Sequence, residues 1–414
     1  MSKPKLLRIT TVPISLEILL TGQLDYMQAN GFDVVAVSSN GSEVNKFTKN
    51  RAIRHQVIEM TRTISPMKDF IALIKLYRFI KKEKPDIVHT HTPKAGLLGM
   101  IAAKLANVPI RLHTVAGLPL MTSKGFRRGL LVVTEKLTYQ CSTETLANSF
   151  SIASFMLKEQ MISIDKLKVL GNGSTNGFDN NRFNLENLSA DRLDFVKREI
   201  SYNPELFYFL YVGRLVVDKG IDELYEAFHK LYAKNKSLRL IILGNFEKER
   251  DSLNEQRVVE IINHPGIIYL GWREDVEYFI SIANTLVHPS HREGFPNILL
   301  QSASMQTPII CSNIPGNIDV VNNDNATLFE VKNTENLLSK MNEVFLNYAV
   351  KKNQATILSN SIIDKYSRET VQQIILDYYL EKLNSKENKL SSNSNESAVI
   401  KNGSIQEPLT SLNY

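Results

Sequence analysis

Short apolar segments alternate with helical segments along most of the chain, in two successive series. The first series predicts strands at 6–12, 33–38, 56–60, 86–91, 111–115, 145–148 and 167–170. The second series predicts strands at 208–212, 238–243, 267–270, 285–289, 309–311 and 327–330. Strands that alternate with helices build parallel sheets, whose ligands lie beyond the carboxyl ends of the strands. The sequence therefore predicts an α/β fold with two sheets, in agreement with the two domains expected for 414 residues.

The boundary between the two series falls at the turn-rich cluster GNGSTNG, residues 171–177. We expect an N-terminal domain over residues 1–183 and a second domain over residues 184–363. A final helix is predicted over 364–384. Residues 385–414 are rich in Ser, Asn, Lys and Glu without periodicity, which predicts a disordered tail.

The stretch 291–316, HREGFPNILLQSASMQTPIICSNIPG, follows an apolar strand and turns into a helix predicted over 297–305. The free N–H groups and partial positive charge at the start of a helix favour a phosphate. Gly294 lets the backbone approach a ligand closely, and the carboxylate of Glu293 can accept hydrogen bonds from sugar hydroxyls. The pattern suggests a ligand with phosphate at one end and hydroxyls at the other. An ordinary strand-to-helix turn with a solvated Glu293 is the plain alternative.

Two cations follow the first strand of the second series, in the motif VGRLVVDKGID at 212–222. Gly213 allows a tight exit from the strand, and Arg214 and Lys219 come shortly after it. An arginine fork and a lysine point charge can together hold a diphosphate. Because both cations lie on the same side of the predicted sheet as Glu293, we expect the three side chains to belong to one site.

The sequence gives little support for a metal site, a disulfide framework or a membrane-spanning helix. Cys141 and Cys311 are far apart in the sequence, which fits a reducing cytoplasm. His89 and His91 form a pair without a third ligand at suitable spacing, and no Asp-X-Asp motif occurs, so no metal is expected. No uncharged apolar run reaches the roughly 18 residues of a transmembrane helix.

Charge is unevenly divided along the chain. Residues 1–190 hold 25 Lys and Arg against 14 Asp and Glu, a net +11, and residues 191–414 hold 24 against 29, a net −5. A basic half predicts attraction to an anionic partner or surface, although a solvated basic face explains the same charge. The segment 123–137, SKGFRRGLLVVTEKL, mixes basic and apolar residues. It is either a membrane-surface segment or a helix partly packed in the core.

Four motifs together resemble the family 4 retaining glycosyltransferases. They are HTHTPKAGLLG at 89–99, NGFDNNRF at 176–183, VGRLVVDKGID at 212–222 and HREGFPNILLQSA at 291–303. The similarity covers most of the chain and is strongest to bacterial transferases that extend lipid-linked polysaccharide repeat units. It implies two Rossmann-like domains that face each other across a cleft, the GT-B fold, with the last helix crossing back to the first domain.

The resemblance also implies the substrates. The donor would be a nucleotide sugar, usually a UDP-hexose or UDP-N-acetylhexosamine, held by the second domain. The acceptor would be a saccharide linked to undecaprenyl diphosphate, held by the first domain at the inner membrane surface. The expected protein is cytoplasmic or peripheral on the inner face of the plasma membrane. The protein is expected to act in cell-surface polysaccharide biosynthesis. It is expected to need no cofactor or metal and to bind no nucleic acid.

Roles for individual residues follow from the same resemblance. Arg214 and Lys219 would grip the donor diphosphate, and Glu293 would hold hydroxyls of the transferred sugar. Gly22 would let the first loop approach the donor. The residues expected to bind substrate are Gly22, His91, Gly213, Gly294, Phe295, Pro296, Asn297 and Gln301.

Two positions depart from the family's pattern. The second of its paired glutamates is Gln301 here, and an amide bonds a ribose diol more weakly than a carboxylate does. Ala116 stands where many relatives have a His before a Gly, and His113 is the candidate catalytic replacement.

These departures favour a second hypothesis, a weakly active or inactive sugar-nucleotide-binding subunit of a polysaccharide assembly complex. The intact cations and Glu293 favour the transferase. The related epimerases of the same architecture match the motifs less well.

Overall fold

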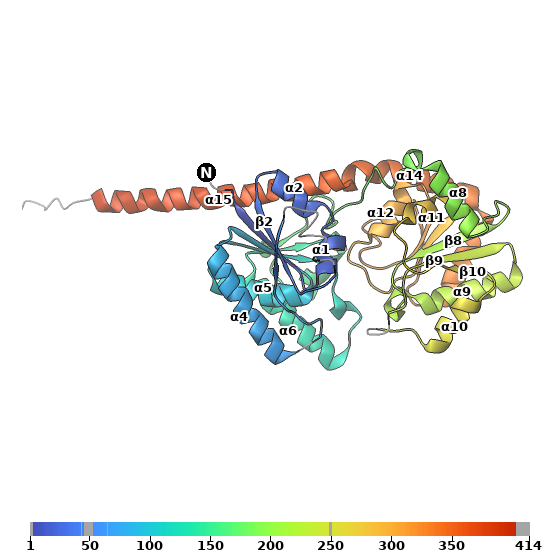
Figure 1. The fold of residues 1–414 in the computed structure, drawn as a ribbon, viewed down its shortest axis with the longest axis horizontal. Helices are drawn as coiled ribbons and strands as arrows, with labels where there is room; N and C mark the ends of the chain where they lie inside the picture. Colours follow the sequence, from blue (N-terminus) through green and yellow to red (C-terminus); the bar gives the residue numbers. More distant parts are fainter. Residues whose placement is uncertain (1–2, 43, 45–52, 64, 248–250, 403–414) are drawn as a thin grey trace, which may run out of the picture.

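The first of two α/β domains is built on a seven-stranded parallel sheet with the order β3-β2-β1-β4-β5-β6-β7 (Figure 1). The computed structural model describes residues 3–42, 44, 53–63, 65–247 and 251–402. The strands are β1 (Lys5–Ile9), β2 (Asp33–Ser38), β3 (Arg54–Val57), β4 (Ile87–His91), β5 (Ile110–Val115), β6 (Glu144–Ala147) and β7 (Leu167–Lys168). The helices are α1 (Pro13–Leu19), α2 (Gln23–Ala29), α4 (Pro66–Glu83), α5 (Pro93–Leu105), α6 (Gly125–Cys141) and α7 (Phe150–Lys158), with short 3-10 turns at η1 (Pro119–Met121) and η2 (Ile164–Lys166).

The second domain has a six-stranded parallel sheet with the order β10-β9-β8-β11-β12-β13. Its strands are β8 (Phe207–Val212), β9 (Leu238–Leu243), β10 (Ile267–Tyr269), β11 (Thr285–His288), β12 (Ile309–Ser312) and β13 (Thr327–Phe329). The helices that follow the first domain are η3 (Leu185–Asn187), α8 (Ala190–Glu199), η4 (Val217–Lys219), α9 (Ile221–Lys234), α10 (Glu255–Asn263), α11 (Val276–Ile282), α12 (Asn297–Ser304), α13 (Thr334–Leu346), α14 (Tyr348–Tyr366) and α15 (Arg368–Asn402).

Each strand predicted from the sequence is present, and the fold class is confirmed. The largest errors in a strand end are at β1, which ends at Ile9 rather than at residue 12, and at β3, which ends at Val57 rather than at residue 60. Successive strand residues point to opposite faces, and both faces are covered. In β1, Leu6 packs with α1, α2 and α15, whereas Leu7 and Ile9 pack with α4, α5 and the end of α6. This double burial explains why the strands read as continuous apolar runs.

The chain passes between the domains twice, and the two crossings lie side by side. Phe178 and Ser367 form a parallel bridge, in which the Phe178 amide donates to the Tyr366 carbonyl at 3.0 Å. Gly177 has φ of +61°, and a Cβ there would lie 2.5 Å from the Tyr366 carbonyl oxygen. Phe183 already packs in the core of the second domain. Both crossings therefore form a single close-packed joint.

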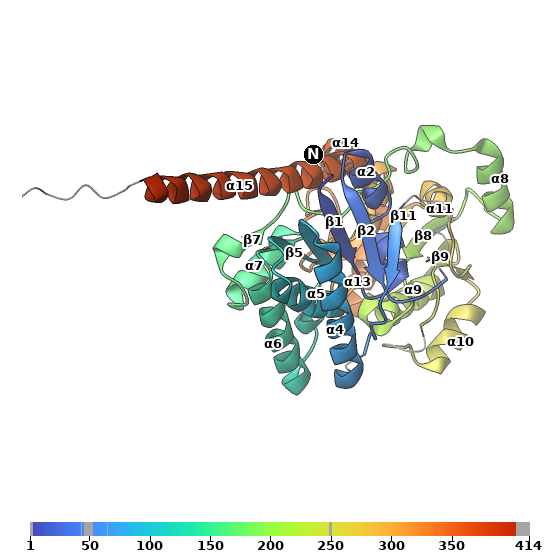
Figure 2. The ribbon, with the colours of Figure 1, turned by 60° about the vertical axis from the view of Figure 1, so that its left-hand side comes forward.

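The last helix returns to the first domain, as expected. α15 runs along the first domain and extends beyond it (Figures 1 and 2). Its apolar face packs on the first sheet through Val371, Ile375, Leu376, Tyr378 and Tyr379. Arg8 of β1 donates a 2.7 Å hydrogen bond to the Tyr379 hydroxyl.

The predicted end of this helix was wrong. α15 continues to Asn402, through most of the segment that the composition assigns to a disordered tail. Residues 385–402 contain no Pro or Gly, so no residue in this segment breaks the helical hydrogen-bond ladder. Residues 403–414 lie outside the described residues. Among the described residues, none of the helices combines the length and apolar content needed to cross a membrane.

Candidate functional site

A cavity of about 170 Å³ opens between the two domains, at the carboxyl ends of their strands. Its walls come from the loop after β5 in the first domain and from the loops after β8 and β11 in the second. The lining residues are Ala116, Gly117, Leu118, Arg214, Asp218, Lys219, Arg292, Glu293 and Gly294. The fold thus brings together Arg214, Lys219, Glu293 and Gly294, which the sequence predicts to share one site.

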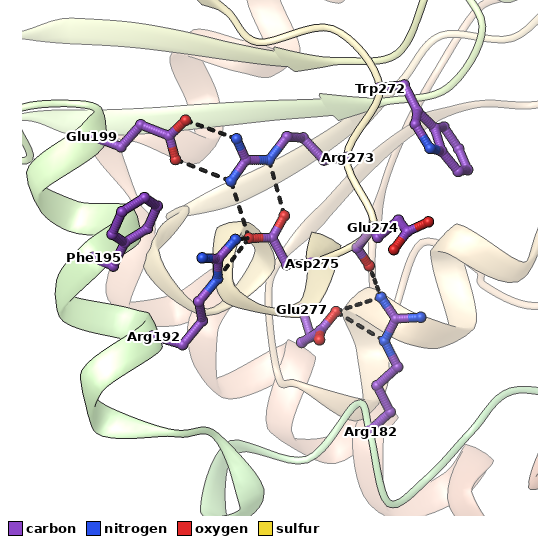
Figure 3. A pocket seen from close by; sticks show the side chains of 9 residues that line it. All are labelled: Arg182, Arg192, Phe195, Glu199, Trp272, Arg273, Glu274, Asp275 and Glu277. Atoms are coloured by element: carbon purple, nitrogen blue, oxygen red, sulfur yellow. Dashed lines mark hydrogen bonds and ion pairs between the residues drawn. The ribbon is translucent and has the colours of Figure 1, made fainter.

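A larger depression of about 770 Å³ lies on the second domain, beside α8 and the start of α11 (Figure 3). Most of its charged side chains are already paired with one another. Arg273 contacts Glu199 at 2.7 Å and Asp275 at 2.9 Å, and Arg192 contacts Asp275 at 2.6 Å. Because these groups satisfy each other, and because the depression is confined to one domain, the cavity between the domains is the better candidate site.

Glu293 is the most enclosed charged group of the cavity, with 14% of its side chain exposed. Its Oε1 accepts a hydrogen bond from Lys219 Nζ, and His288 Nε2 lies 3.0 Å from the same oxygen. Burial alone would raise the pKa of Glu293, but the Lys219 ammonium and the His288 ring hold it well below its usual range. Glu293 is therefore a charged carboxylate at neutral pH, and not the solvated surface residue of the plain alternative.

Arg214 lies in a tight loop that begins at Gly213, directly after β8. The Tyr211 hydroxyl donates a 2.8 Å hydrogen bond to the Arg214 carbonyl oxygen and fixes this loop. The Arg214 side chain is 53% exposed, and its Nη1 lies 2.8 Å from Glu247 Oε2. An exposed ion pair contributes little to stability, so the guanidinium can exchange Glu247 for an anionic ligand at small cost.

Sequence reasoning missed several residues that hold these groups in place. His288 ends β11 and contacts Glu293. Arg292 pairs with Asp218 at 2.8 Å, which joins the loop after β11 to η4. His291 Nε2 lies 2.9 Å from Glu223 Oε1 at the start of α9. A signal was present for two of them, since His291 and Arg292 directly precede Glu293 in the HREG motif.

Gly294 lines the cavity and also contacts the first domain. A Cβ at this position would lie 1.7 Å from the Ala116 carbonyl oxygen of the first domain. That same oxygen accepts a 3.3 Å hydrogen bond from Asn148 Nδ2. The missing side chain therefore lets the second domain touch the loop after β5. The close approach of Gly294 to a ligand stays a prediction, and the contact with the first domain is a second reason for a glycine here.

The residues after Gly294 lead into α12 and do not belong to the cavity lining as described. Pro296 caps the helix, Asn297 is its first residue, and Gln301 follows one turn later on the same face. Phe295 is buried, and its ring centroid lies 5.3 Å from that of Tyr366. Its side chain therefore belongs to the core, while its backbone connects Gly294 to α12.

Three further residues predicted to act in the site lie inside the first domain instead. His113 Nδ1 lies 2.8 Å from Thr90 Oγ1, and burial lowers its pKa to about 4, so the ring is neutral at neutral pH. His91 is buried with its Nε2 2.9 Å from Arg8 Nη2. Both are on central strands that are covered on both faces. Gly22 directly precedes α2 and lies against α15, where a Cβ would be 3.5 Å from Gln372 Nε2.

The described residues were also compared with the expectations for metal and disulfide sites. Within the described ranges, no group of three or more His, Cys, Asp and Glu side chains is arranged to hold a metal ion. Cys141 and Cys311 are both buried free thiols. The charged side chains that line the cavity are three cations, Arg214, Lys219 and Arg292, and two carboxylates, Asp218 and Glu293.

Comparison with known proteins identifies the family. A family model described as glycosyl transferase 4-like matches residues 9–149, and one described as glycosyl transferases group 1 matches residues 194–360. The Staphylococcus aureus capsular polysaccharide biosynthesis glycosyltransferase CapM is 32% identical over 383 residues, which cover 92% of this chain and 97% of CapM. The chain belongs to the family 4 glycosyltransferases. The resemblance seen in the motifs is thereby confirmed.

Two further relatives of this glycosyltransferase are informative. The Escherichia coli UDP-Gal:alpha-D-GlcNAc-diphosphoundecaprenol alpha-1,3-galactosyltransferase is 28% identical over 352 residues, covering 82% of this chain and 87% of the relative. The crystal structure of Anabaena HepE in complex with UDP and glucose aligns with a TM-score of 0.75 at 17% identity, covering 91% of this chain and 100% of HepE. The similarity to HepE shows that the two proteins share a fold.

Proposed function

We propose that this glycosyltransferase moves a hexosyl or N-acetylhexosaminyl residue from a UDP-sugar to a saccharide on undecaprenyl diphosphate, with retention. The similarity to the E. coli galactosyltransferase supports both substrate classes, because its name specifies UDP-Gal and a diphosphoundecaprenol acceptor. The similarity to CapM supports a role in cell-surface polysaccharide biosynthesis. In this proposal the enzyme works at the inner face of the plasma membrane.

The observation that carries the proposal is the charged Glu293 carboxylate beside Lys219 in the cavity between the domains. Glu293 would accept hydrogen bonds from hydroxyls of the transferred sugar. Lys219 and Arg214 would face the diphosphate, one as a point charge and the other as a fork. The start of α12 adds partial positive charge near the same position. The donor would thus lie along the edge of the second sheet.

The transfer step follows from this arrangement. The bond between the anomeric carbon and the diphosphate oxygen breaks, and the acceptor hydroxyl bonds to the same face of that carbon. The hydroxyl proton passes to the departing phosphate oxygen, so the step needs no separate protein base. Negative charge grows on the leaving UDP, and the fixed cations stabilise it most strongly in the transition state.

We further propose that this step is independent of metal, because the cations supply the charge that Mg²⁺ or Mn²⁺ would otherwise bring. Transfer should continue at an undiminished rate in excess chelator, measured with radiolabelled donor. Complete loss of transfer in chelator, restored by added Mg²⁺ or Mn²⁺, would contradict this part of the proposal.

A second candidate is a sugar-nucleotide-binding subunit of weak or no activity, favoured by Gln301 and by Ala116 in the cavity wall. Purified protein should be incubated with a panel of UDP-sugars, with and without extracted lipid acceptor. The transferase predicts donor hydrolysis without acceptor and label transfer with it, for at least one sugar. Tight UDP binding with neither reaction would favour the second candidate, and no binding at all would reject both.

A further inference from the structure

His288 is the last residue of β11, and its side chain is only 6% exposed. Earlier in this strand, Leu286 and Val287 pack in the cores on opposite faces of the second sheet. Because side chains alternate along a strand, His288 points to the same face as Leu286, the face that α12 covers. The chain then loops back to Glu293 just before α12. A buried imidazole is thereby placed against the Glu293 carboxylate, with Nε2 3.0 Å from Oε1.

The Nε2 atom of His288 is buried and has no well-aligned hydrogen-bond partner among the described residues. A buried polar group in that state costs free energy, so its presence calls for an explanation. Glu293 Oε1 is near enough to be that partner, and only the direction of the contact is unfavourable. Hydrogen bonds in a free active site are often poorly aligned and tighten when substrate binds. A small turn of the carboxylate would complete this bond.

The backbone around Glu293 is held on both sides. Before it, Ser290 Oγ donates a 3.0 Å hydrogen bond to the Arg292 carbonyl oxygen. After it, the chain lies so close to Gly316 that a Cβ there would be 2.8 Å from the Gly294 carbonyl oxygen. The position of the Glu293 backbone is therefore fixed by its own loop and by the loop after β12. The direction of its carboxylate depends on the side chains that contact it.

Two side chains contact that carboxylate, and both contacts described go to Oε1. Lys219 Nζ donates to this oxygen, and His288 Nε2 lies beside it. Oε2 is then the oxygen left for a ligand in the cavity that Glu293 lines. The two partners differ in one respect, because Lys219 also lines the cavity and His288 does not. A diphosphate in the cavity would compete for the Lys219 ammonium but not for the His288 ring.

We propose that His288 is a positioning residue for the transfer reaction. When the donor diphosphate engages Lys219, the His288 N–H keeps hold of Glu293 Oε1 and so directs Oε2 toward the hydroxyls of the transferred sugar. A rigid imidazole gives its N–H a fixed direction, whereas a lysine ammonium rotates and can be shared between two anions. The inference rests on the proposed function and extends it to a residue that touches neither substrate.

His288→Gln and His288→Asn form a matched pair of variants. Gln can bring an amide N–H to about the place of Nε2, whereas the shorter Asn cannot reach Oε1, and both side chains are neutral and polar. We expect His288→Asn to lower kcat/KM roughly tenfold or more, because a misdirected carboxylate loses its alignment with the sugar. UDP affinity should be retained, and His288→Gln should recover most of the loss. Wild-type kcat/KM in the Asn variant, or equal losses in both variants, would overturn the inference.

A double-mutant cycle with Glu293→Gln separates positioning from general support of the fold. If His288 acts through the carboxylate, adding His288→Asn to Glu293→Gln should lower kcat/KM by no more than about twofold further. If His288 only supports the fold, the two losses should multiply. Multiplying losses would overturn the positioning role.

Crystal structures without ligand provide a readout that does not depend on activity. In Lys219→Ala, His288 is the remaining described partner of Glu293, so the carboxylate should keep its direction. Adding His288→Asn should let the carboxylate turn, and the same direction in both structures would overturn the inference. A wild-type protein that neither hydrolyses nor transfers any UDP-sugar would overturn the proposed function instead, and the two crystal structures would still decide the role of His288.

Discussion

Glu293 is the most enclosed charged group of the cavity. The substitution Glu293→Gln is therefore the most direct test of the role of a single side chain in the site. The change keeps the shape of the side chain and removes its charge, and charge-assisted hydrogen bonds are about twice as strong as neutral ones. We expect a loss of about 1.5–3 kcal/mol of transition-state stabilisation, or roughly 10- to 150-fold in kcat/KM.

Affinity for free UDP provides the internal control for Glu293→Gln. UDP lacks the transferred sugar, so its binding, measured by calorimetry, should be retained. A variant that turns over normally would remove Glu293 from the site. A parallel loss of UDP affinity would assign Glu293 to the nucleotide instead of the sugar.

Arg214 and Lys219 should act on the diphosphate. Replacing either with Ala should raise the donor KM and lower kcat, because each cation neutralises charge that grows on the leaving group. Arg239→Ala is the control, since Arg239 is on the same sheet at the opposite end of β9, where its Nη1 donates to the Lys236 carbonyl. Steady-state kinetics that leave both site variants unchanged would exclude the two cations from the site.

The residue types alone did not indicate which of the candidate site residues would line the cavity. Glu293, Arg214 and Lys219 were predictable because they follow strand ends, where parallel sheets place their ligands. His91 and His113 also stand near strand ends, but their side chains point into covered faces of the sheet. The direction of a side chain at the last residues of a strand depends on the pleat and on the packing of α5 and α15. That packing involves residues far apart in the sequence, so the local sequence does not predict it.

At the scale of elements, α15 is held to the first domain by a buried polar contact as well as by apolar packing. The Arg8 guanidinium is fully buried and is held by Tyr379, Gln23 and His91. The Tyr379 hydroxyl also lies 2.5 Å from His89 Nδ1. A buried cation with neutral partners depends strongly on each of its hydrogen bonds.

Tyr379→Phe should therefore destabilise the protein by about 1–3 kcal/mol, because it leaves Arg8 and His89 each short of a partner. Urea unfolding of the full chain measures the change. Tyr26→Phe is the matched control, since its 2.6 Å hydrogen bond to Gln373 is solvent-exposed and should contribute within about 0.5 kcal/mol. Equal stabilities for the two variants would mean that apolar packing alone holds α15.

Strands were easier to predict than the ends of helices, for a physical reason. A buried parallel strand needs a short apolar run between polar turns, and β2 and β9 match their predicted bounds. Helix ends depend on capping and on contacts distant in sequence. α15 therefore starts at Arg368, where the bridge to Phe178 ends the preceding helix, and not at residue 364.

At the scale of the whole molecule, the two domains meet at a joint and at a contact across the cavity. The joint pairs Phe178 with Ser367, and the contact sets Gly294 against Ala116. Ser151 adds a third link, because its amide donates to Asp319 Oδ1 at 3.0 Å. The cavity is thus bounded by contacts that hold the domains close together, and its shape depends on their separation.

Gly294→Ala tests whether that separation matters for catalysis. The new Cβ would meet a backbone carbonyl, which cannot rotate away as a flexible side chain does, so the loop after β11 and the first domain must move apart. Because Glu293 precedes this residue, we expect its carboxylate to shift and kcat/KM to fall roughly tenfold or more. Gly129→Ala in α6 is the control, since a Cβ there meets nothing within 4 Å. Melting temperatures measured alongside the kinetics separate misfolding from misalignment. Full activity in Gly294→Ala would show that the enzyme works without this contact, and the cavity between the domains would then have to form in another arrangement of the two sheets.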